Sequence, residues 1–280
     1  MDISSRPGRS EVRILPPRQK DPTHCRPSST IPSVRVNERH SGFPGLALGG
    51  YVAGILAASS THVGALEVRI HRAVRIGDEF ELQPDAAALM HDAEAVATAR
   101  PVALDLHPPK IITREAAETA SAGYLGLEHH FFATCFCCGS ARRAGEGLRI
   151  FPGVVDGTLL AAPWRPADHL GDATVPTEIL WSALDCPGIW AQIFVSTGTG
   201  EKGVTGSMAV LQLRPVPARE TALVLAWPIG RDGRKISVGS ALTTERGDLM
   251  VIARQTLVVT DRGVPLDLDV WRSAPPPTGS

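Results

Sequence analysis

One pattern occurs twice in this chain and limits how it can fold: a helix-like segment is followed by several strand-like segments. The helix-like segments are "GGYVAGILAASS" at 49–60 and a largely apolar stretch at about 176–193. The strand-like segments after them cover 65–83 and 93–104 in the first copy, and 207–227, 234–242 and 248–259 in the second. Both copies therefore predict the same unit, a helix followed by long antiparallel strands.

The strand prediction rests on alternating, β-branched segments such as Val68–His71 and Leu211–Arg214. Turn-forming residues at Asp232-Gly233 and at 246–248 separate the strands of the second copy. A short stretch of the two copies also aligns without gaps, pairing Arg72 with Arg214, Val74 with Val216, and Asp78 with Glu220. We therefore predict an α+β fold in which each half is a long helix wrapped by a curved antiparallel sheet, rather than a βαβ repeat.

The same pattern predicts the domain organisation. Residues 1–30 are rich in Pro, Ser and Arg without periodicity, and 273–280 have the same character, so both ends are expected to be flexible tails. Between them we predict a first half at 31–108, a linker at 109–127 with a short helix beginning near Thr113, and a second half at 128–272.

Composition excludes several function classes. The 28 Lys and Arg residues nearly balance 29 Asp and Glu residues, so no basic field suggests a nucleic-acid partner. No apolar run approaches the ~20 residues of a membrane span, and the N-terminal segment lacks the apolar stretch of a secretory signal. The five cysteines are an odd number and do not suggest a secreted disulfide framework. We expect a cytoplasmic protein with reduced thiols.

At three motifs the chain resembles the hotdog fold in its tandem, double-hotdog form, and within it the type II, medium-chain acyl-CoA thioesterases. The resemblance covers roughly residues 35–272. The similar segments are the opening helix Gly49-Gly50 through Ala58, the second-half helix Ala183-Leu184-Asp185-Cys186 through Trp190, and the late strand "VIARQTL" with Gln255. The resemblance implies a hydrolase of acyl thioesters, with acyl-CoA or an acyl-carrier protein as partner, no cofactor, and a homodimer, because double hotdogs expose sheet edges.

Asp185 is the one carboxylate in the apolar stretch 179–194. Glu178, Trp181, Ser182 and Asp185 follow the spacing i, i+3, i+4, i+7, so they share one face of a helix. A generic helix with this pattern has a solvated polar stripe. In a double hotdog the face points toward the other half, where the fold binds its thioester. Pro187-Gly188 removes one helical hydrogen bond and predicts that the helix bends or ends there.

The resemblance implies that Asp185 acts as a general base on a water molecule held between Asp185 and Gln255, although a carboxylate can also act as a nucleophile on the thioester. Without that role, Gln255 would be an ordinary outward-facing strand residue. The acid has no equivalent on the first-half helix, so we expect one working site per chain.

Backbone N–H groups at the start of the first helix are expected to stabilise the oxyanion and bind substrate, namely those of Gly49, Gly50 and Tyr51. The two glycines could equally serve close helix packing. Trp181, on the same face as Asp185, is a further expected substrate-binding residue. The family's hydroxyl ligand would fall near "AWPIGRDG" at 226–233, where we find no counterpart.

The segment "HHFFATCFCCG" contains His129, His130, Cys135, Cys137 and Cys138. Cys135-x-x-Cys138 has the spacing of a zinc knuckle, but no second such pair exists in the sequence. We therefore expect no metal, and thiols that act as small hydrophobes at a strand edge. A cysteine nucleophile with a histidine base is a less favoured alternative.

Other catalytic motifs are missing from the sequence: it has no P-loop, no G-x-G-x-x-G, no H-E-x-x-H and no G-x-S-x-G. A hotdog hydratase pairs its Asp with a nearby His, which "DCPGIW" lacks. Two hypotheses remain: a thioester hydrolase, and a non-catalytic hotdog that binds acyl-CoA or an acyl chain or serves as a scaffold.

Overall fold

The computed structural model describes residues 33–194 and 201–262. Both predicted tails, 1–30 and 273–280, lie outside these ranges. The described helices are α1 (Gly49–Ala58), α2 (Arg114–Ala122) and α3 (Thr177–Ala191), with short 3-10 helices η1 (Glu38–His40), η2 (Leu125–Leu127), η3 (Asp168–Leu170) and η4 (Gln192–Phe194). The linker helix expected near Thr113 is confirmed as α2. The Thr113 side chain caps the start of this helix by accepting a hydrogen bond from the N–H of Ala116.

Eleven described strands form one antiparallel sheet. They are β1 (Ser33–Arg35), β2 (Leu66–Ile70), β3 (Glu79–Gln83), β4 (Ala88–His91), β5 (Glu94–Pro101), β6 (Gly153–Asp156), β7 (Leu159–Trp164), β8 (Glu201–Gln212), β9 (Ala222–Asp232), β10 (Lys235–Thr244) and β11 (Leu249–Arg262). The large antiparallel sheet with few helices agrees with the predicted fold class.

The strand order shows that the sequence repeat is also a repeat of topology. At the centre of the sheet β2 pairs with β8, so that Leu66 lies opposite Val210 and Arg69 opposite Ser207. Outward from β2 the order is β5, β4, β3, β1, and outward from β8 it is β11, β10, β9, β7, β6. The first strand after each long helix therefore lies at the centre, next to its counterpart.

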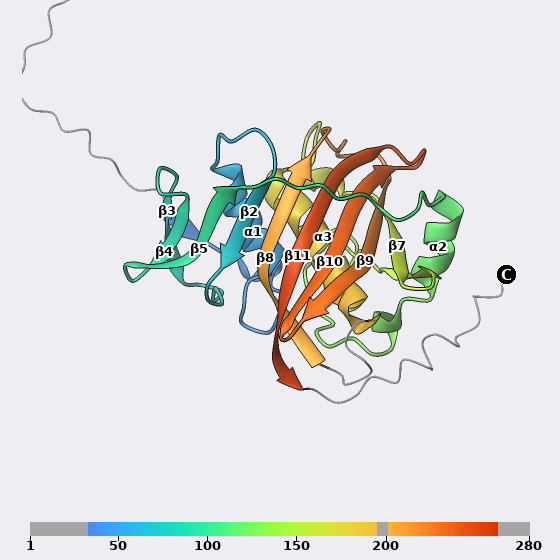
Figure 1. Ribbon diagram of the computed structural model, residues 1–280, viewed down its shortest axis with the longest axis horizontal. Coiled ribbons are helices and arrows are strands. Elements are labelled where there is room, and N and C mark those ends of the chain that lie inside the picture. Colours follow the sequence, from blue (N-terminus) through green and yellow to red (C-terminus); the bar gives the residue numbers. More distant parts are fainter. Residues whose placement is uncertain (1–32, 195–200, 263–280) are drawn as a thin grey trace, which may run out of the picture. The chain divides into compact units, whose positions relative to one another are not determined.

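Helices α1 and α3 pack against each other and against the central strands, as Figure 1 shows behind the sheet. The opposite face of the second-half strands is covered by the connection after β5 and by α2. There Ile112 and Ala117 pack with Leu223, Leu225 and Trp227. Alternate residues of β9, such as Val224 and Ala226, belong to the core on the helix side. No helix among the described residues is long and apolar enough to cross a membrane.

Helix α3 is buried nearly all round, since every residue from Ile179 to Gly188 is buried. The interpretation of its polar residues as a solvated stripe is therefore wrong. The helix also continues past Pro187 to Ala191 rather than ending there. A hydroxyl from the sheet supports it at this point, because Ser240 on β10 donates to the Leu184 carbonyl at 2.9 Å.

The contact between α1 and α3 is close because α1 presents glycines to it. A Cβ atom on Gly50 would lie 2.6 Å from the carbonyl oxygen of Trp181 and 2.7 Å from the Cβ of Asp185. Gly54, one turn later on the same face, faces the backbone of Glu178 equally closely. The glycines thus bring the start of α1 directly against Asp185.

Candidate active site

Asp185 lies at the junction of three elements and is completely buried, with 0 % of its surface exposed. Its Oδ2 accepts a hydrogen bond from the backbone N–H of Gly50 on α1 at 2.7 Å. Its Oδ1 accepts from the hydroxyl of Thr205 on β8 at 2.7 Å and also from the Nε2 of Gln255 on β11. Burying a carboxylate is costly unless such donors compensate for lost water, so all three elements are needed to hold it.

Thr205 supplies the hydroxyl for which the sequence offered no candidate near 226–233. It comes from the preceding strand, β8, which begins at Glu201 rather than at Ser207 as expected. Gly203 and Gly206 flank Thr205 and weaken the strand signal, because glycine has low strand propensity. The pairing with β11 shifts between Thr205 and Ser207, because Ser207 lies opposite Thr256 but Thr205 lies opposite Leu257. This irregularity at Gly206 turns Thr205 toward α3, whereas strict alternation backward from 207–212 would have placed it on the other face of the sheet.

Gln255 is completely buried and points at the carboxylate, so the outward-facing alternative is wrong. Its Nε2 also donates to the Thr205 hydroxyl at 2.9 Å, which closes a triangle with Asp185. Its Oε1 has no hydrogen-bond partner among the described residues and faces the Cα of Gly188, where a side chain would collide with it. The amide oxygen is thus packed against α3, on the side away from the carboxylate.

The electrostatics of the site favour a carboxylate that is more basic than usual. Burial raises the pKa of Asp185 to about 6, although the hydrogen bonds from Thr205 and Gly50 act in the opposite direction and lower the pKa. At neutral pH the carboxylate is thus mostly ionised yet accepts a proton more readily than an exposed Asp.

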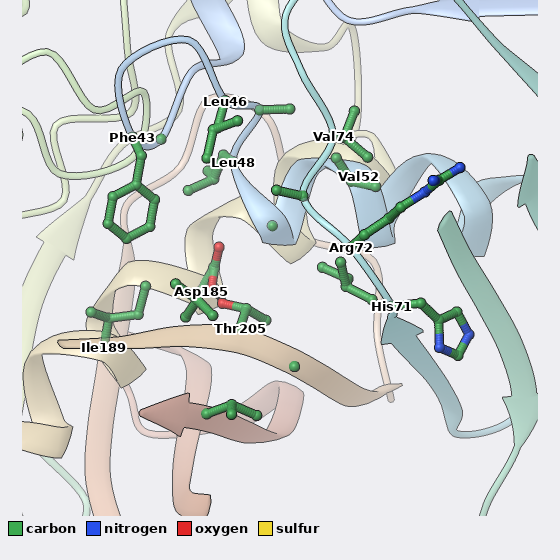
Figure 2. Close-up of a pocket in the computed structure, with 18 residues that line it drawn as sticks. Phe43, Leu46, Leu48, Val52, His71, Arg72, Val74, Asp185, Ile189 and Thr205 are labelled. Atoms are coloured by element: carbon green, nitrogen blue, oxygen red, sulfur yellow. Dashed lines mark hydrogen bonds between the residues drawn. The ribbon is translucent and has the colours of Figure 1, made fainter. Parts of the chain in front are cut away.

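A pocket of about 290 Å³ reaches this group. Figure 2 shows Asp185 and Thr205 together within it, with Leu48, Ile189 and Phe43 nearby, whereas His71 and Arg72 point away. Thr205 is only partly buried, so it is the member of the triangle that the pocket exposes. The other lining side chains are mostly aliphatic and come from both halves, including Leu46, Val52, Ile70, Val74 and Val258.

The first turn of α1 brings backbone donors to the pocket. The N–H of Gly50 is used by Asp185, so it is not the free donor that we expected. Gly49 lines the pocket, and a Cβ on it would lie 3.0 Å from that of Thr205. Its N–H has no partner within the described parts of the chain, as expected at the start of a helix. Trp181 does not line this pocket; it packs at the α1–α3 contact and lines a separate cleft.

Tyr51 does not line the pocket either. Its ring stacks on that of His40, with 3.8 Å between the ring centroids. Burial, together with the positive charges of Arg39 and Arg142, lowers the pKa of His40 to about 4. His40 is therefore held neutral beside the start of α1, and its Nδ1 has no partner among the described residues.

The lowered pKa of His40 predicts a loss of stability in acid. Above pH ~6.5 the residue is neutral in both the folded and the unfolded chain; as pH falls toward 4, the unfolded chain takes up a proton that the folded chain does not. We expect His40→Phe, which keeps a ring against Tyr51, to lose less stability than wild type between pH 7.5 and 4.5. Urea unfolding at both pH values measures this, with exposed His107→Gln as control. Equal acid sensitivity of His40→Phe and wild type would contradict the prediction.

The cysteine-containing segment forms turns rather than the expected strand edge. Cys135, Cys137 and Cys138 are buried. His130 is not placed to act as a base on a thiol, because its Nδ1 accepts from the N–H of Phe132 and its Nε2 lies 2.9 Å from the Cys138 carbonyl oxygen. His129 is exposed. The cysteine-nucleophile alternative therefore has no support from the geometry.

Comparisons with known proteins agree with the fold. No protein-family model matches the sequence, and no curated protein matches it significantly. Solved structures do match. A putative thioesterase from Novosphingobium aromaticivorans has a TM-score of 0.55 at 13 % identity, over 82 % of this chain and 95 % of that one.

Two mycobacterial proteins match to a similar degree. The TesB protein of Mycobacterium avium subspecies paratuberculosis has a TM-score of 0.53 at 13 % identity, over 79 % of this chain and 90 % of that one. The acyl-CoA thioesterase II TesB2 of Mycobacterium marinum has a TM-score of 0.51 at 12 % identity, over 75 % and 90 %. In fold, therefore, the chain is similar over most of its length to the type II acyl-CoA thioesterases.

Proposed function

We propose that this protein hydrolyses acyl thioesters, with acyl-CoA or an acyl-carrier protein as the thiol component. The observation that carries the proposal is the triangle of Asp185, Thr205 and Gln255, of which Asp185 and Thr205 line a mostly apolar pocket. A buried carboxylate with two polar neighbours suits a general base, and aliphatic walls suit an acyl chain.

In the proposed reaction a water molecule from the pocket replaces a direct hydrogen bond to Asp185 and binds between its carboxylate and the side chains of Thr205 and Gln255. Asp185 takes a proton from it while its oxygen attacks the thioester carbonyl carbon. When the tetrahedral intermediate collapses, the carbon–sulfur bond breaks and the protonated Asp185 returns the proton to the leaving thiolate. The products are a carboxylic acid and a thiol, so no cofactor takes part.

The oxyanion of the intermediate needs a donor, and we assign this role to the backbone N–H of Gly49. It lies at the positive end of α1, it lines the pocket, and it is free of other partners among the described residues. The neighbouring N–H of Gly50 instead holds Asp185 in place. Adjacent amides of one helix turn would thus orient both the base and the substrate carbonyl.

We further propose that the two halves are tandem hotdogs. The same strand order runs outward from β2 and from β8, and α1 and α3 occupy corresponding positions beside them. Each half contributes to the site, since the first supplies Gly49 and Gly50 and the second supplies the three side chains. The equivalent site would need an acid on α1, which has none, so we expect one site per chain.

Substitution of Thr205 tests the proposal. Thr205→Val keeps the shape of the side chain but removes the hydroxyl, and Thr205→Ser keeps the hydroxyl but removes the methyl group. We expect Val to lower kcat by about ten- to a hundredfold, the worth of a hydrogen bond to a charged group, and Ser to retain most activity. Free-thiol release from acyl-CoA substrates of graded length measures both.

Equal activity of Thr205→Val and wild type would remove the hydroxyl from the mechanism. A wild-type protein that binds acyl-CoA saturably without releasing thiol would instead support the non-catalytic hypothesis. One observation favours that alternative: the carboxylate already accepts three hydrogen bonds from the protein and has no exposed surface.

A further inference from the structure

Four buried thiols converge beside α3. Cys135, Cys137 and Cys138 come from the turns after η2, and Cys186 follows Asp185 on α3. Each is at most 4 % exposed, and all four are free of disulfides. The sequence alone suggested hydrophobic thiols because it contains no second Cys-x-x-Cys pair. In the structure Cys186 lies beside these thiols, although it is 51 residues from Cys135 in the chain.

The sulfur atoms lie at distances suited to a shared metal ion. The Sγ atoms of Cys135 and Cys186 are 3.5 Å apart, and those of Cys135, Cys138 and Cys186 all lie within 4.8 Å of one another. Tetrahedral zinc with bonds of 2.3 Å places its sulfur ligands about 3.8 Å apart. Cys137, the fourth thiol, is fully buried and adjoins Cys138 in the chain.

A tight backbone turn holds Cys135 near Cys138. The turn closes with the N–H of Gly139 donating to the Cys135 carbonyl at 3.0 Å. A side chain at Gly139 would collide with that carbonyl, so the turn requires glycine. The turn thereby fixes the positions of two of the three clustered sulfur atoms.

All four thiols belong to the hydrophobic core, together with Phe136 between the first two cysteines. Three of them are distinguished by their sulfur atoms, which lie within 4.8 Å of one another, and by the small cavity of about 60 Å³ that they line.

We propose that Cys135, Cys138 and Cys186 bind a thiophilic metal ion, for which Zn²⁺ is the first probe. Binding releases the thiol protons to solvent. The ion would tie the turns after η2 to α3 at the residue next to Asp185. This inference is independent of the proposed hydrolysis.

Metal analysis of the full chain, purified untagged and without chelators, tests the proposal. We expect about one zinc per chain by elemental mass spectrometry. After chelation under reducing conditions, added Co²⁺ should produce the thiolate-to-metal charge-transfer and visible bands of tetrahedral sulfur coordination. Cys186→Ser should lose the metal and these bands, and Cys25→Ser, which removes the cysteine outside the described residues, should keep both.

Circular dichroism tests whether Cys186→Ser folds. If this variant does not fold, the Co²⁺ spectrum of the wild type still tests the proposal, because it needs no variant. Three results would overturn the proposal. One is a reduced wild-type protein that takes up neither Zn²⁺ nor Co²⁺. Another is metal retained by Cys186→Ser. The third is an intact mass that shows a disulfide in the cluster of the isolated protein, combined with a lack of metal binding after that disulfide is reduced.

Discussion

Replacement of Asp185 by Asn is expected to lower kcat for thioester hydrolysis by about 10²- to 10⁴-fold, the range for loss of a general base. The amide has the same shape and can still accept the N–H of Gly50, but it cannot take a proton from water. KM should change little, because the carboxylate is proposed to activate water rather than to bind the acyl group. Thiol release under saturating acyl-CoA measures the change.

A matched control lies on the same helix. Glu178, two turns before Asp185, is partly exposed and forms no part of the triangle, so Glu178→Gln should keep wild-type turnover. Asp185→Asn should remain folded by circular dichroism, since the neutral amide avoids the cost of a buried charge. If Asp185→Asn retained more than about a tenth of wild-type kcat, the base would have to be sought elsewhere.

The elements of the fold could be predicted where periodicity is strong. The apolar stretch around Asp185 became α3, and the β-branched segments became β8 to β11. The start of β8 could not be placed, because Gly203 and Gly206 interrupt the alternation through which a strand is recognised. That interruption concealed Thr205, the member of the triangle that the pocket exposes.

Residues that act through tertiary contacts were harder to predict. Asp185 and Gln255 were paired through the resemblance to the thioesterases, because the pattern of neither segment indicates that the two residues meet. The use of the Gly50 N–H by Asp185 depends on how closely α1 and α3 approach, which no local pattern encodes. Likewise Cys186 reaches the cysteine-containing turns only through the packing of α3, 51 residues after Cys135 in the chain.

The close approach of the two helices leads to the second large effect that we expect. Gly50→Ala and Gly54→Ala would each place a methyl group against the backbone of α3, at Trp181 and Glu178 respectively. The helices must then move apart, and overpacking of this kind costs about 1–3 kcal/mol of unfolding free energy. Urea unfolding should show a loss of this size for both variants.

Activity should separate the two glycine variants. Of the two glycines, only Gly50 donates a hydrogen bond to Asp185, at 2.7 Å. Displacement of Gly50, unlike that of Gly54, therefore directly moves the carboxylate relative to Thr205. We therefore expect Gly50→Ala to lower kcat by about ten- to a hundredfold under conditions where both variants are fully folded, and Gly54→Ala to stay much closer to wild type. Equal losses in both variants would mean that helix spacing, and not the Gly50 hydrogen bond, limits catalysis. The comparison thus tests whether the start of α1 is part of the active site or only packs against it.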